Sequence, residues 1–535
     1  MISIFKNFWN NINGLNGLLL IVYLIFIFMT AIIVSEHFTI YFFVVSAFFI
    51  VLLTFIIAPR VLRAFAPIHI CNNELSSSDK FDNHKNIIRI AFYVFPFVIL
   101  LIYYIAYYPG VFTPDQVDQY SQAIRNSYND WHPVIHTLFA FKFPLLITGG
   151  WTGSILLFQI LYSSIALGYS FNVLYTHIHL KYSVFCALFV LLNPQISYIA
   201  IYPWKDISFA VGALLLVTYA LQIYMTKGKW IKSPLNTAIF IITATFTSLF
   251  RHNAILFTIP LIISTLFYLT RKKGVLVCLS ILFLCFSIKV PMYSMIGSEA
   301  TEKRQMELLG LPMTVIGATV TYAPEHLDND ILEFAYKVAP KEVWEEKYEY
   351  GSFNHVKWDE RTNNDIIEEY GSAKVVSMMF RCLKQSKMAG VTSLIKLTEV
   401  TYSISNYQNT VPIYETAPNE FGLSTGGIDR LKGILRGYSD FASCCFPHVF
   451  MCLGVLHLLL IVFALAKCRL NRIQNLKILF FILPVFINNY GITLLLTGKE
   501  DAFRYFYYTY LLAPVLIAFL IKDNNESSTE KTKNH

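Results

Sequence analysis

The chain consists largely of long apolar runs separated by short polar segments. An α-helix needs about 17–25 apolar residues to cross a hydrocarbon core of about 30 Å. Runs that reach or approach this length lie near residues 14–34, 38–58, 89–107, 153–175, 183–202, 207–225, 235–250, 254–270, 275–290, 446–466, 478–496 and 505–521. They predict an all-α polytopic membrane protein with about twelve transmembrane helices.

Two segments do not fit the spanning pattern. The apolar run 134–147 is short and carries Lys142, so we expect a helix that lies at the membrane interface or dips into it. The segment 291–445 is hydrophilic, with 21 Asp and Glu residues against 15 Lys and Arg residues. Its expected helices, Asn329–Ala339 and Asp365–Lys387, alternate with Gly- and Pro-marked turns, which predicts an α-rich or mixed domain outside the membrane.

These segments predict the following organisation of the chain. Two N-terminal spans and a cytoplasmic loop occupy 1–88, a transmembrane core with a first outside loop at 108–133 occupies 89–290, an extracytoplasmic domain occupies 291–445, C-terminal spans occupy 446–521, and a disordered cytoplasmic tail occupies 522–535. No Cys pair has metal-binding spacing, and we expect the nine cysteines to be free thiols.

Charge supports this organisation and fixes an orientation. With the N-terminus in the cytoplasm, the inside segments hold 20 Lys and Arg residues and the short outside segments hold six. Cytoplasmic loops carry such an excess of positive charge. The chain has 55% hydrophobic and only 14% charged residues, and its mean hydropathy is +0.52. In such a chain the net charge of +8 indicates a basic cytoplasmic face, not a nucleic-acid partner. Both termini are expected in the cytoplasm of a cell-membrane protein.

The first outside loop contains candidate acid–base groups. Asp115 and Asp118 are three residues apart and share a face if they are helical. Asp115 follows Thr113 and Pro114, so it is either a helix-start carboxylate next to an N-cap or a general base just above the bilayer. His132, before Pro133, either begins the next helix or offers an imidazole to a phosphate or a proton.

Two further outside loops carry charge beside the membrane. Lys205 and Asp206 form either an interfacial pair next to Trp204 or a phosphate ligand and a second carboxylate. Arg251 and His252 interrupt an apolar hairpin, where unpartnered polar side chains are costly and therefore indicate function.

A fourth polar group precedes the last span. Arg504, followed by Tyr505, is either an interfacial anchor or a planar guanidinium that clamps a phosphate. All of these acids and cations lie on one predicted membrane face. That distribution favours an anionic, lipid-linked substrate whose tail stays in the bilayer.

The same residues resemble a known group of enzymes. The loop with Pro109-Gly110, Asp115, Gln119 and Trp131-His132-Pro133 resembles the multi-span GT-C glycosyltransferases, and especially an uncharacterised bacterial branch of membrane proteins. Trp204-Lys205-Asp206, Arg251-His252-Asn253 and Arg504-Tyr505 are similar to that pattern. The resemblance covers roughly 89–290 and 446–521. The two helices ahead of residue 89 depart from the commonest arrangement.

The resemblance implies an activity. A GT-C-like enzyme takes a sugar from a polyprenyl-phosphate-linked donor and transfers it outside the cytoplasm, with inversion, to a cell-surface glycan, lipid or protein. The matching catalytic base is Asp115; Asp118, His132 and Asp206 would assist it, and Lys205, Arg251, His252, Arg504 and Tyr505 would bind substrate. Some members also hold a divalent metal, but no further carboxylate stands beside Asp206, and we assign no metal ligands.

Other functions also predict a polytopic membrane protein. A transporter or flippase of lipid-linked glycans would show internal repeats and polar residues at the bilayer midplane. A wall-polymer ligase or polymerase would share the architecture and use a lipid-linked oligosaccharide donor. The polar clusters gather on one predicted face, which favours the transferase.

Overall fold

The computed structural model describes residues 79–298, 308–403, 415–470, 476–498 and 503–521. Within these ranges the chain is helical and has no strand; one isolated bridge joins Glu349 and Ser352. This agrees with the predicted membrane α-helical protein. The predicted spans at 14–34 and 38–58 and the predicted tail at 522–535 lie outside the described residues.

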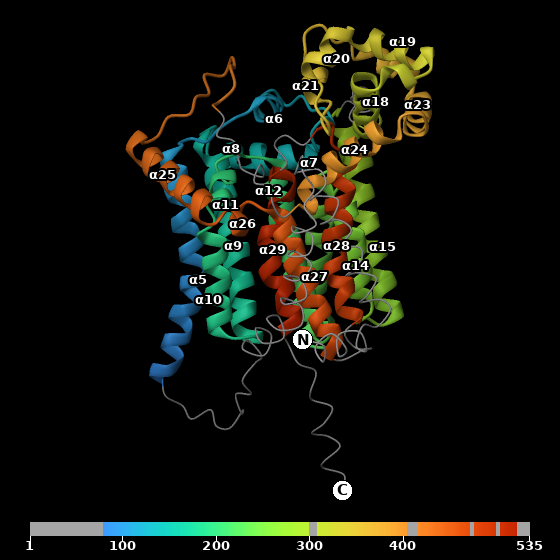
Figure 1. Cartoon of the computed structure of the whole chain (residues 1–535). Helices are drawn as coiled ribbons and strands as arrows, with labels where there is room; N and C mark the ends of the chain where they lie inside the picture. The colour runs from blue at the N-terminus through green and yellow to red at the C-terminus, as the bar shows by residue number, and fades with distance from the viewer. Residues whose placement is uncertain (1–78, 299–307, 404–414, 471–475, 499–502, 522–535) are drawn as a thin grey trace.

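Among the described residues, five helices are long and apolar enough to cross a membrane, and they match predicted spans. They are α5 (Asp79–Ala106), α9 (Gly153–His177), α12 (Lys205–Met225), α15 (Arg271–Ser287), which continues through η4 (Ile288–Met292) and α16 (Tyr293–Met295), and α29 (Phe503–Ile521). Figure 1 shows them running in one general direction through the body of the molecule. A lipid-filled environment favours such helices because their backbone groups are satisfied internally.

Five shorter apolar helices occupy other predicted spans. They are α10 (Leu180–Leu191), α13 (Pro234–Leu249), α14 (Ile255–Leu266), α27 (Leu453–Leu470) and α28 (Leu476–Thr493). The single helix predicted at 183–202 is wrong. After α10 the chain breaks, and Asn193 accepts a hydrogen bond from the Gln195 amide to start α11 (Pro194–Ile199). Pro194 has no amide hydrogen and so favours a helix start over a helix interior.

The run 134–147 forms a bent helical segment of 14 residues. It comprises α7 (Val134–His136), the π-helical turn η2 (Thr137–Lys142) and α8 (Phe143–Ile147). At about 1.5 Å per residue it is too short to cross a bilayer core. Figure 1 places it at the upper end of the bundle, and the Lys142 ammonium donates to the Ala123 carbonyl at 3.0 Å.

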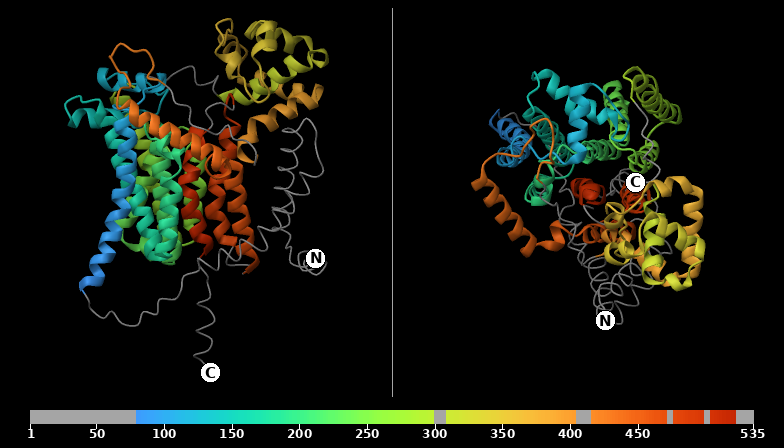
Figure 2. Two further views of the ribbon diagram at one scale, coloured as in Figure 1. Left: turned by 60° about the vertical axis from the view of Figure 1, so that its left-hand side comes forward. Right: turned by 90° about the horizontal axis from the view of Figure 1, so that it is seen from above.

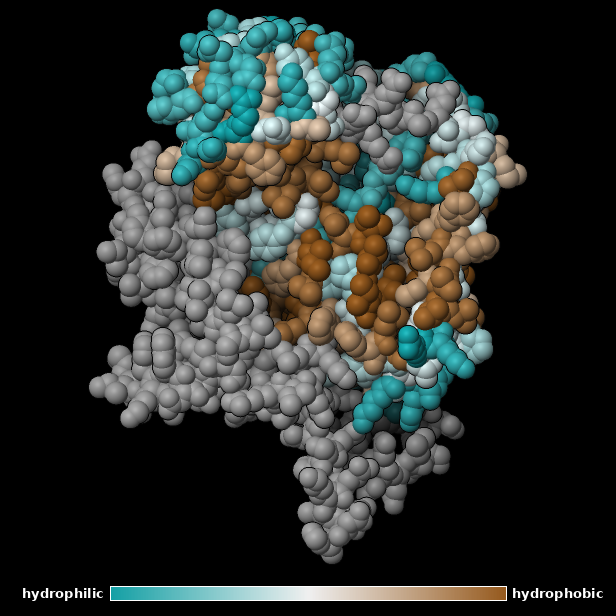
Figure 3. Space-filling model, turned by 90° about the vertical axis from the view of Figure 1, so that its right-hand side faces the viewer, coloured by the Kyte–Doolittle hydropathy of each residue, from teal (hydrophilic) through white to brown (hydrophobic). Residues whose placement is uncertain are grey.

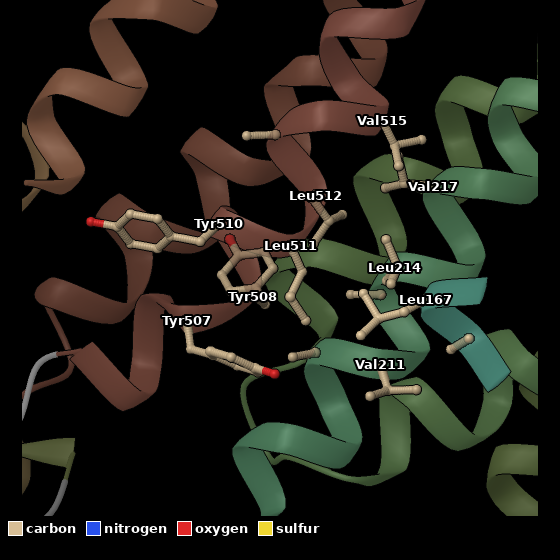
Figure 4. Packing of buried hydrophobic residues seen from close by; sticks show 14 of the residues in the cluster. Leu167, Val211, Leu214, Val217, Tyr507, Tyr508, Tyr510, Leu511, Leu512 and Val515 are labelled. Carbon is tan, nitrogen blue, oxygen red and sulfur yellow. The ribbon is translucent and has the colours of Figure 1, made fainter. Parts of the chain in front are cut away.

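The centre of the bundle is the pairing of α12 with α29. Figure 4 shows Val515 of α29 next to Val217 of α12, and Leu511 on the side of α29 toward Leu214 of α12. In the apolar 18-residue window of α12, 89% of the residues are buried. A side chain at Gly212 would place its Cβ 2.2 Å from the Thr247 hydroxyl of α13, so only glycine allows these two helices to approach this closely.

A separate helical domain sits on the upper end of the bundle. Its helices are α18 (Gly310–Tyr322), η5 (Pro324–His326), α19 (Asn329–Val338), α20 (Lys341–Lys347), α21 (Asn354–Lys357), α22 (Asp365–Tyr370), α23 (Ser372–Gln385) and α24 (Lys387–Thr398). They share a hydrophobic core of their own around the buried Trp344. The predicted helical stretch Asp365–Lys387 is helical but divided, because the chain breaks at Gly371, which has a φ of +76°, and again at Ser386.

The rest of the predicted extracytoplasmic segment packs elsewhere. Residues 415–427 run along the first outside loop, where the Ala417 and Gly426 amides donate to the Phe112 and Tyr108 carbonyls. The following helix, α25 (Asp429–Cys445), contacts α5 and α11, and Figure 2 shows it lying across the upper end of the bundle, apart from the α18–α24 domain. The described residues of 291–445 thus form the end of the helix that α15 begins, the α18–α24 domain, and a strap made of residues 415–427 and α25.

Hydrophilic and hydrophobic side chains occupy different zones of the surface, and these zones follow the arrangement of bundle and domain. In Figure 3 the α18–α24 domain is largely hydrophilic, a band of apolar side chains lies below it, and hydrophilic side chains return at the lower end of the molecule. Such a band is expected of a surface that contacts lipid.

Candidate functional site

The loop after α5 and the loop before α12 are joined by their backbones. After α5 the chain turns through Gly110, whose φ is +128° and whose Cα lies too close to the Ile201 carbonyl for a side chain to fit easily. The Val111 amide then donates to the Ile201 carbonyl at 3.0 Å. This pairing brings the start of α6 (Pro114–Arg125) beside the start of α12.

Asp115 and Asp118 lie in the first turns of α6 and share a face, as their spacing predicts. Each has a carboxylate oxygen 4.0 Å from Nε2 of His132. Pro114 is the first helical residue, as expected, but Thr113 makes no side-chain cap; its hydroxyl donates to Gln116 instead. The Gln116 side chain also accepts from the Trp204 indole at 2.9 Å, which ties α6 to the loop before α12.

The contact between His132 and Lys205 indicates which ring nitrogen of His132 carries the proton. Its side chain is 3% exposed, and Nδ1 lies 3.0 Å from the Lys205 ammonium. An ammonium group only donates, so Nδ1 accepts and the proton of the neutral ring sits on Nε2, toward the two aspartates. His132 thus lies between Lys205 and the two aspartates, and it also lines the cavity. Its role toward substrate stays a prediction.

Asp206 and Arg251 form a buried pair behind this group. Their side chains are 3% and 4% exposed, and Arg251 Nε lies 3.1 Å from a carboxylate oxygen of Asp206. The guanidinium also lies over the rings of Phe209 and Tyr505, at 5.4 and 5.2 Å from their centroids. Asp206 therefore lies against Arg251, and its predicted part in the chemistry stays a prediction.

Arg504 reaches the site from the start of α29. Its Nη1 lies 3.7 Å from a carboxylate oxygen of Asp115, and its Nη2 donates to the Tyr505 hydroxyl at 2.7 Å. The guanidinium lies over the rings of Trp204 and Tyr505, at 5.4 and 4.8 Å. Aromatic faces hold a planar cation in a fixed orientation while leaving its edge available for hydrogen bonds.

These side chains line a cavity of about 500 Å³. Three cations, Lys205, Arg251 and Arg504, share its wall with the carboxylate of Asp115. Among the described residues, Nη1 of Arg251 and Nε of Arg504 are buried and have no hydrogen-bond acceptor. Buried donors of this kind are costly unless a ligand accepts from them, and an anion is the best acceptor.

The surroundings shift the pKa values of the two aspartates in opposite directions. Burial alone would raise the pKa of Asp115, but the neighbouring His132, Lys205 and Arg504 side chains favour the ionised carboxylate and hold this pKa below its usual value. Burial raises the pKa of Asp118, and the negative charge of Asp115 adds to this effect. Burial, reinforced by the charge of Lys205, lowers the pKa of His132 well below its usual value, so the ring is neutral at pH 7.

The structure brings all nine predicted site residues into one cluster. Seven line the cavity: Asp115, His132, Lys205, Arg251, His252, Arg504 and Tyr505. Asp118 and Asp206 lie beside it as neighbours of His132 and Arg251. Residues that are remote in sequence therefore meet in the fold, which the one-face distribution of charge predicts.

Sequence reasoning identified none of the residues that the α18–α24 domain contributes to the site. Asn354, Lys357 and Trp358 line the same cavity as Asp115. The only available signal was an aromatic residue beside a lysine in a hydrophilic stretch, which alone is unspecific. The apolar part of the lining comes from α28 and the residues after it, including Ile492, Leu495 and Leu496.

Within the described ranges no group of three or more His, Cys, Asp or Glu side chains could hold a metal ion. No family model, curated protein or solved structure matches this chain. The geometry of the cavity is therefore the basis for assigning a function.

Proposed function

We propose that this protein is a membrane glycosyltransferase that moves a sugar from a polyprenyl-phosphate-linked donor to an acceptor outside the cytoplasm. The observation that carries the proposal is the cavity at one end of the membrane helices, where Lys205, Arg251 and Arg504 stand beside the ionised carboxylate of Asp115. Cations that bind a phosphate and a base that binds an acceptor hydroxyl are the two parts that such a transfer needs.

The cations would hold the phosphate of the donor. Arg251 and Arg504 are preorganised by aromatic rings and by Asp206 and Tyr505, so they need not reorganise when charge develops on the leaving group. The apolar side chains of Ile492, Leu495 and Leu496 in the same wall suit the first part of a lipid tail. A lipid anchor would place the donor at the membrane surface.

The transfer is a single displacement. The acceptor oxygen attacks the anomeric carbon while the bond from that carbon to the phosphate oxygen breaks, and the bonding electrons leave with the polyprenyl phosphate. The proton of the acceptor hydroxyl passes to Asp115, which is ionised and therefore able to accept it. Attack from the side opposite the leaving group inverts the anomeric configuration.

The topology belongs to the same proposal. We place the N- and C-termini in the cytoplasm and the cavity on the outer face, with about twelve spans in a GT-C-like bundle. Support comes from the excess of Lys and Arg in the expected inside loops and from the common upper position of α6, α7 and the α18–α24 domain in Figure 1. In this arrangement the sugar is transferred to a cell-envelope acceptor.

An Asp115→Asn variant tests the proposal. The amide keeps the shape of the carboxylate and removes its basicity, so we expect transfer to fall by about 10²–10⁴-fold. Surface glycans are compared by mass spectrometry in cells without the gene, with wild type and with the variant, at equal membrane expression. A sugar substituent that depends on wild type and is lost with the variant supports the proposal.

Asp118→Asn is the matched comparison. This carboxylate lies equally close to His132 but outside the cavity lining, so its loss should reduce transfer far less. If Asp115→Asn restores the same glycan as wild type, then Asp115 is only a helix-start carboxylate, and transport of a lipid-linked glycan becomes the better explanation.

A further inference from the structure

The α18–α24 domain contributes its own wall to the cavity, and this wall differs from the membrane wall. Asn354, Lys357 and Trp358 come from α21 and the residue after it, and none of them is acidic. The membrane wall supplies three cations and the base Asp115, whereas the domain wall combines an amide and an indole with the single cation Lys357. Two chemically distinct walls in one cavity suit a reaction with two substrates.

The domain wall is fixed to the membrane part of the protein. The Phe353 amide donates to the Thr497 carbonyl at 2.7 Å, and the Thr497 hydroxyl donates to the Asn354 side chain. Thr497 lines the cavity just beyond the end of α28. These bonds fix the position of α21 beside the cavity. A ligand bound to the domain wall would therefore lie at a defined place relative to Asp115.

Trp358 is the unusual member of the wall. It is 71% exposed, whereas Lys357 beside it is 3% exposed and places its ammonium 4.7 Å from the centre of the Trp358 ring. Single exposed aromatic residues are common on protein surfaces and need no explanation by themselves. An exposed indole that also lines a cavity, with its orientation restrained by a buried lysine, is a preorganised flat surface for a ligand.

The ligand that fits this surface is a saccharide. A sugar ring presents a flat patch of C–H groups that packs on an aromatic face, and its hydroxyls bond to amide and ammonium groups such as those of Asn354 and Lys357. A lipid chain is disfavoured because the chain after Trp358 is Asp359-Glu360-Arg361, which is charged and largely exposed. The apolar residues of the cavity lie instead on the α28 side.

We propose that Trp358 is the platform on which the acceptor's sugar unit stacks, so that the acceptor is a glycan. This inference rests on the proposed function and names the acceptor class that the function leaves open. Trp358 then positions the acceptor hydroxyl toward Asp115 and takes no part in the chemical step.

The test measures two kinds of binding to the full-length purified protein. The first probe is a panel of neutral disaccharides of glucose, galactose, mannose and N-acetylglucosamine, followed by saturation-transfer NMR. The second is undecaprenyl phosphate in detergent micelles. The variants are Trp358→Ala, Trp358→Phe and Phe380→Ala; Phe380 is a control aromatic residue, 62% exposed on the same domain but outside the cavity lining.

We expect at least one disaccharide to bind wild type, with Trp358→Ala weakening it tenfold or more, Trp358→Phe retaining most of the affinity and Phe380→Ala changing nothing. Binding of undecaprenyl phosphate should be equal in all four proteins. The inference is overturned if undecaprenyl phosphate binds but no disaccharide does, or if Trp358→Ala binds the disaccharide like wild type.

The two proposals fail in different ways. If wild type binds a disaccharide through Trp358 but shows no affinity for undecaprenyl phosphate, then the saccharide site stands and the proposed lipid-linked donor is wrong. Because Trp358 is exposed, its substitution should leave folding intact, and the phosphate probe verifies this for each variant.

Discussion

Arginine–aspartate pairs occur in both parts of the molecule, and they differ in what they do. In the membrane part, Arg251 and Asp206 are almost fully buried and make a single contact at 3.1 Å. In the α18–α24 domain, Arg381 contacts both Asp328 and Asp330 while all three side chains are a third or more exposed. The domain pairs are satisfied by each other and by water, whereas Arg251 keeps a buried donor without an acceptor among the described residues.

The difference shows how burial converts an ordinary ion pair into part of a binding site. An exposed pair gains little because solvent screens it. Burying an ion pair costs free energy because both charges lose their hydration. This cost is tolerated where the hydrogen-bonding groups that the pair leaves unused can bind another molecule. In this protein the unused donor belongs to a residue that lines a cavity together with three further cations, Lys205, Lys357 and Arg504.

The largest expected effect comes from breaking the buried pair. Arg251→Ala leaves the carboxylate of Asp206 buried without its partner, which should cost about 3–5 kcal/mol of stability. The measurement is thermal and denaturant unfolding of the purified protein in detergent. Arg381→Ala is the matched control and should shift the unfolding midpoint only slightly, because Arg381 and its two partners are exposed. Equal shifts in the two variants would remove the contrast between the regions.

A smaller effect is expected at the cation nearest the base. Arg504→Ala should lower the rate of sugar transfer by about 10²–10³-fold, since it removes a preorganised charge from the leaving group. Arg504→Lys keeps the charge but loses the planar fork and should recover only part of the rate. Transfer is measured with membranes of equal protein content. Full activity in a normally folded Arg504→Ala variant would exclude the role of Arg504 on phosphate.

The smallest effect concerns the neutral histidine. Because burial lowers the pKa of His132 far below the value of 6.5 that an unfolded chain shows, the unfolded state binds a proton first as the pH falls below about 6.5. Stability is therefore fully present above pH 6.5 and declines as the pH falls. His132→Gln should flatten this decline, as measured by the unfolding midpoint between pH 7.5 and 5.

The pH experiment has its own control in the other region. His326 of the domain has a side chain that is 61% exposed, and His326→Gln should leave the decline as it is in wild type. The lowered pKa of Asp115 acts in the same direction but only below its ordinary value of 3.8, outside the measured window. A decline that persists unchanged in His132→Gln would show that this ring is not held neutral by the fold.

Many helices of the bundle could be predicted because a lipid environment allows few backbone conformations. Long apolar runs must be helical there, and the five longest helices match predicted spans. The candidate site was predictable for a related reason. A charge beside or within a membrane is costly, so Asp115, Lys205, Arg251 and Arg504 stood out without any knowledge of their contacts.

The errors lie where one or two residues break a helix inside a segment that is otherwise of one character. The run 183–202 is mostly apolar, yet Asn193 and Pro194 divide it into two helices. The polar stretch Asp365–Lys387 has helical periodicity, yet Gly371 breaks it with a positive φ. Neither break changes the apolar or polar character of its segment, so hydropathy alone does not reveal it.

The sequence by itself determined that this is a membrane α-helical chain and which polar residues carry unusual cost. The tertiary structure decided their roles, because burial and partner distance depend on contacts between segments far apart in the chain. It placed Asp206 against Arg251, and His132 between Lys205 and Asp115. It also placed Trp358, more than 200 residues after Asp115, in the same cavity, which no local pattern encodes.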